Sequence, residues 1–199
     1  MGLDLEPKEG DTVLSPEELD MLIPKHVTTR TQLDEVEQAN VEEGLVWLLS
    51  QRNITTEKLF SKDFQDKLHV KMFGQVWEWA GKTRTRETNI GVLPYQIEIE
   101  RKKLNDDAIF WCKTSKGMTP KQIAITFHHK LIQIHCYPNG NGRHGRIMAD
   151  LIVERLYELN KFEWITKDIL HIGEARNTYI AAMKSADKND YKPLFSLIK

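Results

Sequence analysis

Apolar side chains recur at three- or four-residue spacing through most of this 199-residue chain, and that period restricts it to a mainly helical fold. Residues 62–79 show the pattern best, because every fourth position carries Phe64, Leu68, Met72 or Val76. A chain of this length can bury a sizeable core. We therefore expect one helical domain over residues 31–199, preceded by an N-terminal arm with a short helix over residues 1–30.

Capping signals place several of the expected helices. Ser15 followed by Pro16 and Glu18 predicts the short helix, which should stop before Pro24. A hydroxyl cap at Thr31 predicts a longer helix to about residue 51. Three more helices are expected, over residues 119–134, 143–159 and 167–185.

One stretch departs from the helical period. Residues 83–99 contain an Asn-Ile-Gly turn signal between short β-favouring runs, which predicts a small hairpin. The expected fold class is therefore mainly α, a helical bundle with one small β-hairpin.

Composition excludes several classes of protein. The net charge of −1 is spread without a basic stripe, so we expect no direct nucleic-acid binding. Apolar runs are too short to cross a membrane, and the N-terminus lacks the pattern of a signal peptide, so a cytoplasmic location is expected. Cys112 and Cys136 are isolated, and His128 and His129 diverge on a helix, so neither a disulfide framework nor a zinc site is indicated.

Residues 135–146, HCYPNGNGRHGR, combine three chemical features. The glycine-rich loop leads directly into a helix, whose N-terminal N–H groups suit a phosphate. Arg143 and Arg146 lie three residues apart at that same helix end, where cations are unfavourable unless an anion is expected. His135 is a candidate general base. Each feature alone has a structural explanation as a turn, a surface arginine pair or a packed histidine, but their coincidence favours a phosphate-transfer site.

This segment resembles the signature of the Fic family, H-x-F-x-[D/E]-G-N-G-R-x-x-R, with Tyr137 in place of Phe. The resemblance implies a Fic-type helical bundle that transfers AMP from ATP to a Ser, Thr or Tyr hydroxyl of a target protein. It also implies the roles of the motif residues: His135 as base, Gly140, Asn141 and Gly142 as phosphate-binding residues, and Arg143 and Arg146 on the terminal phosphates. Intact Gly142 favours nucleotidyl transfer over phosphorylation.

Asn139 departs from the signature, which has Asp or Glu at this position. Mg²⁺ accompanying ATP is the expected cofactor, and a neutral amide oxygen should bind it more weakly than a carboxylate. This departure keeps alternatives open: a catalytically weak nucleotide- or protein-binding module, or an enzyme that removes AMP.

Similarity to the family extends outside the motif. Residues 73–84 resemble the segment that leads into the Fic flap, which would hold a target peptide through Asn89, Ile90, Gly91 and Tyr95. The extent of similarity, including residues 174–179, resembles the subgroup called mobile mystery protein B. That resemblance implies a mobile-element origin and a helix-turn-helix or antitoxin-like partner; the target protein and the oligomeric state are not indicated.

Many Fic proteins carry an inhibitory glutamate on a helix, and no window of residues 28–48 matches its motif fully. Helical geometry favours Glu37, which lies on the apolar side of its helix, whereas Glu35 points outward. A carboxylate on a buried face needs a cationic partner. Two partners are possible, Arg146 of the motif or a purely structural cation, and we expect Arg146.

Overall fold

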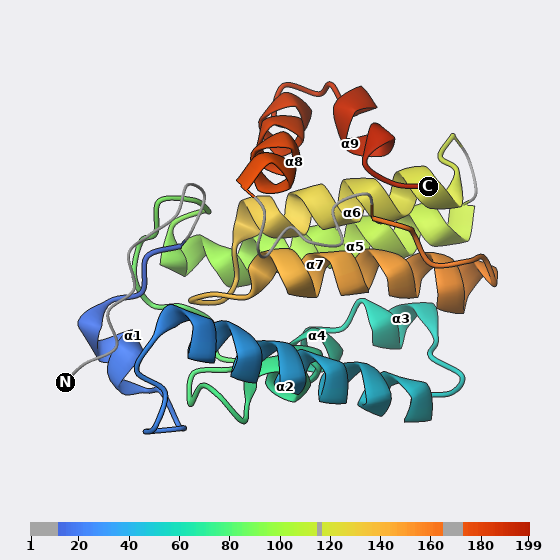
Figure 1. Cartoon of the computed structure of the whole chain (residues 1–199). Coiled ribbons are helices and arrows are strands. Elements are labelled where there is room, and N and C mark those ends of the chain that lie inside the picture. Colours follow the sequence, from blue (N-terminus) through green and yellow to red (C-terminus); the bar gives the residue numbers. More distant parts are fainter. Residues whose placement is uncertain (1–11, 115–116, 165–172) are drawn as a thin grey trace.

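The computed structural model describes residues 12–114, 117–164 and 173–199, and these parts form a bundle of helices (Figure 1). In chain order the helices are α1 (Pro16–Asp20), α2 (Arg30–Ser50), α3 (Thr56–Leu59), α4 (Lys62–Phe73), α5 (Ile97–Thr114), α6 (Pro120–Ile134), α7 (Asn141–Leu151), α8 (Gly173–Ala186) and α9 (Lys192–Ser196). A 3₁₀ turn (Pro94–Gln96) precedes α5, and a π-helical turn (Ile152–Leu156) extends α7. The expected helical fold class is confirmed.

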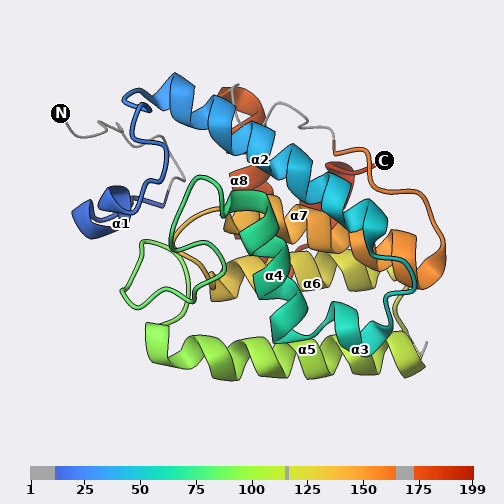
Figure 2. The same cartoon turned by 90° about the horizontal axis from the view of Figure 1, so that it is seen from below.

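Helices α5, α6 and α7 lie side by side in the middle of the molecule, with α6 packed against both neighbours (Figures 1 and 2). Helices α8 and α9 lie on one side of this layer, and α2, α3 and α4 lie on the other (Figure 1). The large side chains between the layers, such as Phe73, Phe127 and Met148, are fully buried. Within the described residues, no helix combines the length and the apolar character needed to cross a bilayer.

Helix α2 crosses α4 at close range (Figure 2), and two residues of α2 make this crossing possible. A Cβ atom on Gly44 would lie 3.1 Å from the Lys71 carbonyl, so only glycine fits without displacing the α4 backbone. One turn earlier, the Asn40 side chain donates to the Lys71 carbonyl oxygen (3.1 Å) and accepts from the Gln75 N–H (3.0 Å). The crossing thereby fixes the position of Glu37, one turn further toward the start of α2.

Helix boundaries follow the capping signals with small corrections. Helix α1 has the expected Ser15–Glu18 capping box. Helix α2 is capped by Thr29 instead of Thr31, because Gln32 completes a capping box with Thr29. The helix expected over residues 62–79 ends at Phe73, where the chain turns.

The bounds of three further helices differ from the expected ones. Helix α7 begins at Asn141, two residues before the expected start. Helix α8 is described from Gly173 to Ala186, so the predicted segment 167–172 lies outside the described residues. Helix α5, over residues 97–114, was not predicted.

The predicted hairpin over residues 83–99 is wrong. Residues 83–93 form an irregular loop without strand pairing, and α5 begins at Ile97. Across the described residues, β structure is limited to the isolated bridges Leu22–Trp77 and Trp164–Ile198. The loop is held instead by the buried Arg84 side chain, whose guanidinium donates to the carbonyls of Arg86 and Val92, groups that a hairpin would pair through its backbone.

The tight α2–α4 crossing predicts the effect of Gly44→Ala. Alanine favours a helix over glycine by about 1 kcal/mol, but its methyl group would force the two helices apart, which costs roughly 1–3 kcal/mol. We expect a net decrease in the free energy of unfolding, measured by urea denaturation. Val46→Ala on the exposed face of the same helix is the control and should change stability by less than about 0.5 kcal/mol. An increase in stability for Gly44→Ala would contradict the close crossing.

Candidate active site at the α6–α7 turn

The motif spans the turn from α6 into α7, and two residues with positive φ shape it. His135 ends α6 in a left-handed conformation (φ 57°), and Gly140 precedes α7 with φ 79°. A Cβ atom on Gly140 would lie 2.6 Å from the Phe73 ring, so this position requires glycine. A non-glycine residue in the left-handed region is strained, and such strain is concentrated at functional sites.

Hydrogen bonds fix the loop between these two residues. Asn141 accepts from the Tyr137 N–H (3.0 Å) and donates to the Tyr137 carbonyl oxygen (2.8 Å). His69 accepts from the Gly81 N–H at Nδ1 and therefore carries its proton on Nε2, which donates to the Asn139 carbonyl oxygen (3.0 Å). The side chain of Asn141 therefore fixes the loop by pairing with both backbone groups of Tyr137.

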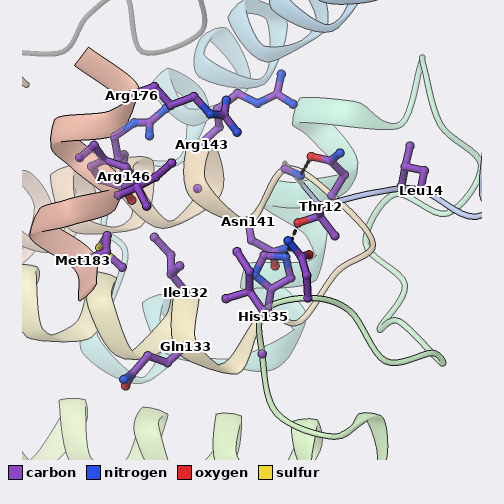
Figure 3. A pocket seen from close by; sticks show the side chains of 18 of the residues that line it. Thr12, Leu14, Ile132, Gln133, His135, Asn141, Arg143, Arg146, Arg176 and Met183 are labelled. Carbon is purple, nitrogen blue, oxygen red and sulfur yellow. Dashed lines mark hydrogen bonds between the residues drawn. The ribbon is translucent and has the colours of Figure 1, made fainter. Parts of the chain in front are cut away.

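His135 is buried beneath the N-terminal segment of the chain (Figure 3). Its Nε2 atom lies 2.8 Å from the Thr12 hydroxyl oxygen. Burial, and then the charge of Arg84, lower the pKa of His135 to about 4. The imidazole is therefore neutral at physiological pH and able to accept a proton.

Arg84 positions His135 through the main chain. Its Nε donates to the His135 carbonyl oxygen (2.6 Å), and its Nη2 reaches the Val92 carbonyl oxygen on the 83–93 loop. The Arg84 N–H donates to the Cys136 carbonyl oxygen (2.9 Å). One buried side chain therefore joins the end of α6 to the loop beside it.

The N-terminus of α7 offers unpaired donors to an anion. The first i to i−4 bond of the helix runs from the His144 N–H to the Gly140 carbonyl oxygen (3.0 Å), so the N–H groups of Asn141, Gly142 and Arg143 precede the helical ladder. A Cβ atom on Gly142 would meet its nearest neighbour at 3.8 Å, the Arg146 guanidinium, so this residue borders open space. These groups and the helix dipole suit a phosphate.

Glu37 lies in the site, as the helical-face argument predicted, but its partner differs. Its Oε2 atom lies 2.6 Å from Nη2 of Arg143, and its Oε1 atom accepts from the Trp77 indole N–H (2.6 Å). The expected pairing with Arg146 is therefore wrong. Both arginines project from the same side of α7, and the crossing of α2 brings Glu37 to the first of them.

Arg146, one turn further along α7, faces α8 instead (Figure 3). Its guanidinium carbon lies 5.7 Å from the centre of the Tyr179 ring, a cation–π contact. Burial is the main cause that lowers its pKa, and the neighbouring charge of Arg143 adds to the effect. Two partly buried cations near a helix N-terminus are stabilised by a bound anion.

A cavity of about 750 Å³ joins these groups, and its size is typical of a small-molecule site. The candidate residues of the motif line it, as do the flap residues Asn89, Ile90 and Gly91. Among the lining residues, cationic side chains outnumber carboxylates by five to three. Tyr95 lies in the 3₁₀ turn before α5, strongly exposed and outside this lining, so the structure separates it from the other flap residues.

Asn139 also lines the cavity, and its Oδ1 atom accepts from the Gly140 N–H (2.6 Å). An amide oxygen can accept a second interaction, so Asn139 could supply one neutral ligand to a cation. Phosphate oxygens and water would supply the other ligands of that cation. The described residues contain no group of three or more His, Cys, Asp or Glu side chains placed around a metal. His128 and His129 point to different partners, Tyr179 and Asp187.

Sequence reasoning missed three residues of the site. Thr12 and Trp77 gave no signal, because their contacts with His135 and Glu37 join positions far apart in the chain. Arg84 stood at the start of the flap segment, but a buried arginine that binds carbonyl groups cannot be distinguished by sequence from one on the surface.

Comparison with known proteins agrees with this geometry. The model of the Fic/DOC family matches residues 59–153, which contain the whole motif. The chain is similar to the protein adenylyltransferase fic-1 of Caenorhabditis briggsae, with 30% identity over 117 residues, and to that of Caenorhabditis elegans, with 29% over 117 residues. Each alignment covers 57% of this chain and 21% of the relative, so the chain spans about a fifth of those proteins.

Solved structures extend the similarity to the fold. The BepC protein of Bartonella tribocorum, with bound AMPPNP, superposes with a TM-score of 0.68 over 96% of this chain and 92% of its own, at 18% identity. The N-terminal Fic domain of Bep8 from Bartonella sp. 1-1C also gives 0.68, at 17% identity, over 87% and 86% of the two chains. With the motif, the family match and the fold in agreement, the chain carries a domain of the Fic/DOC family.

Proposed function

We propose that this chain is a protein adenylyltransferase, which transfers AMP from ATP to a hydroxyl side chain of a protein. The observation that carries the proposal is the placement of a neutral imidazole, with a hydroxyl at Nε2, in the same cavity as two arginines and the N-terminus of α7. The names of the similar nematode proteins support it. The subgroup, the cytoplasmic location and the helix-turn-helix partner stay predictions.

Each of the site residues has a separate role in the proposed reaction. His135 removes the proton of the acceptor hydroxyl, whose oxygen attacks the α-phosphorus of ATP. The new O–P bond forms as the bond from the α-phosphorus to the bridging oxygen of pyrophosphate breaks. The backbone N–H groups at the start of α7, with Arg143 and Arg146, stabilise the negative charge on the leaving group. Mg²⁺, the expected companion of ATP, would neutralise phosphate charge, and the amide oxygen of Asn139 would help to hold it.

Glu37 restrains this reaction. Its ion pair takes up one of the two arginines that the terminal phosphates need, and its second oxygen is held by Trp77. A charge-assisted hydrogen bond of this kind contributes about 1.5–3 kcal/mol, which an incoming phosphate must replace. ATP therefore binds productively only when Glu37 withdraws from Arg143.

His135→Ala tests the base. We expect incorporation of AMP from α-labelled ATP to fall by at least about 10²-fold, since general-base catalysis contributes that much, while nucleotide binding persists. The measurement is labelling of the chain and of proteins in a lysate, with binding measured by calorimetry. Activity within tenfold of the unaltered chain would contradict this role. Binding of ATP without any transfer by the unaltered chain or its Glu37 variants would favour the binding-module alternative.

Asn139→Asp tests the metal. A carboxylate is a better ligand for a hard cation than an amide, so the Mg²⁺ concentration that gives half-maximal labelling should fall. Asn139→Ala is the matched control and should raise that concentration. An unchanged Mg²⁺ dependence in both variants would show that residue 139 does not reach the metal.

Glu37→Gly and Glu37→Gln test the restraint. Both free Arg143, and glutamine keeps an acceptor for the Trp77 N–H. Labelling should therefore rise by about tenfold or more, because about 1.4 kcal/mol corresponds to a factor of ten and the lost contact contributes at least that much. Glu43→Gly places the same glycine in α2 at an exposed position and controls for the weakened helix. Activation by Glu43→Gly alone would mean that the wrong glutamate was assigned.

A further inference from the structure

The N-terminal segment brings a hydroxyl group to the candidate base. Thr12 is buried, and its Oγ1 atom lies 2.8 Å from Nε2 of His135 (Figure 3). In the tautomer that a base requires, with the proton on Nδ1, Nε2 accepts from the Thr12 hydroxyl. That contact is the one a general base needs with the proton it removes, within the usual range of roughly 2.6–3.2 Å.

The loop beside the site holds this segment in place. Arg86, from the same 83–93 loop as the flap residues, donates to the Val13 carbonyl oxygen through Nη2 and pairs with Glu18 through Nε (2.9 Å) and Nη2 (2.5 Å). Leu14 is buried and lines the cavity beside Thr12. The loop expected to dock a target peptide therefore docks the chain's own residues 12–14, through a main-chain contact and a buried side chain.

Room for the nucleotide remains with this segment in place. Thr12 lines the same cavity as Gly142 and Arg146, and the cavity measures about 750 Å³ with Thr12 present. Figure 3 shows Thr12 against His135, joined by the dashed hydrogen bond, and Arg143 and Arg146 away from that contact. The acceptor hydroxyl, the base and the phosphate-binding groups thus share one continuous space.

We propose that Thr12 is an intramolecular acceptor, so that the chain attaches AMP to its own N-terminal segment. This inference rests on the proposed function. Thr12 Oγ1 forms a bond to the α-phosphorus of ATP, the bond from that phosphorus to pyrophosphate breaks, and His135 Nε2 takes the hydroxyl proton. The product is a threonine phosphodiester of AMP, whose bulk can no longer sit on His135, so the modified segment leaves the site open to other acceptors.

The test uses the full chain carrying Glu37→Gly, incubated with ATP and Mg²⁺ and examined by peptide mass spectrometry. AMP is expected on Thr12. Thr12→Ser keeps the hydroxyl and should keep the modification, whereas Thr12→Val has the same shape without the hydroxyl and should lose it. Detection of AMP only on other residues of the chain would overturn the proposal.

A mixing experiment tests the intramolecular route. The Glu37→Gly chain is incubated with a His135→Ala chain of distinguishable mass, and AMP should appear on Thr12 of the active copy alone. Equal modification of Thr12 in the inactive copy would show transfer between molecules and overturn the route.

Failure of this inference is separable from failure of the proposed function. If the Glu37→Gly chain labels lysate proteins but never Thr12, self-modification is wrong and the proposed function stands. If neither that chain nor its Thr12→Val form transfers AMP to any protein, the proposed function fails and this inference fails with it.

Discussion

The turn at His135 is the constraint on which the site depends. Only six residues, 135–140, join two helices that pack against each other, so the chain must reverse sharply. Left-handed residues at both ends of the turn make the reversal possible, and the Asn141 side chain closes it by pairing with both backbone groups of Tyr137. The turn then aims the imidazole into the same cavity that the first residues of α7 border. Arg84 holds the strained end by bonding to the His135 carbonyl, which ties catalytic geometry to the loop beside it.

The cationic side chains at the start of α7 suit a bound anion. Arg143 and Arg146 stand at a helix N-terminus, where each is opposed by the dipole and by the other. Glu37 compensates Arg143, and the electron-rich face of Tyr179 lies near Arg146. The ion pair with Glu37 offsets the unfavourable charge of Arg143 in the folded chain. A phosphate that binds Arg143 would have to displace the same ion pair. This competition is the physical basis of the restraint that we propose for Glu37.

Sequence alone predicted much of the bundle and the centre of the site, because both depend on local patterns. The four-residue apolar period marked α4, and the cap at Ser15 marked the start of α1. Helical angles placed Glu37 on a buried face, but they could not choose between Arg143 and Arg146, which project from one side of α7. That choice depends on how α2 crosses the bundle, and the crossing depends on Gly44. The hairpin failed for a similar reason, since the Arg84 side chain supplies hydrogen bonds that a local β pattern assigns to backbone pairs.

Both groups that contact the polar residues of the site come from the first forty residues, and they contact different partners. Glu37 occupies the phosphate side through Arg143, and Thr12 occupies the acceptor side through His135. A buried polar group without a partner is costly, so the chain supplies its own residues where substrates would otherwise bind. The two contacts differ in what their removal requires. A phosphate must outcompete Glu37 for a cation, whereas Thr12 can remain in place while ATP binds, because it presents the chemical group that the reaction consumes. In the proposed reaction, release of Arg143 by Glu37 would therefore precede any change at Thr12, and α2 would set the order of events for the whole site.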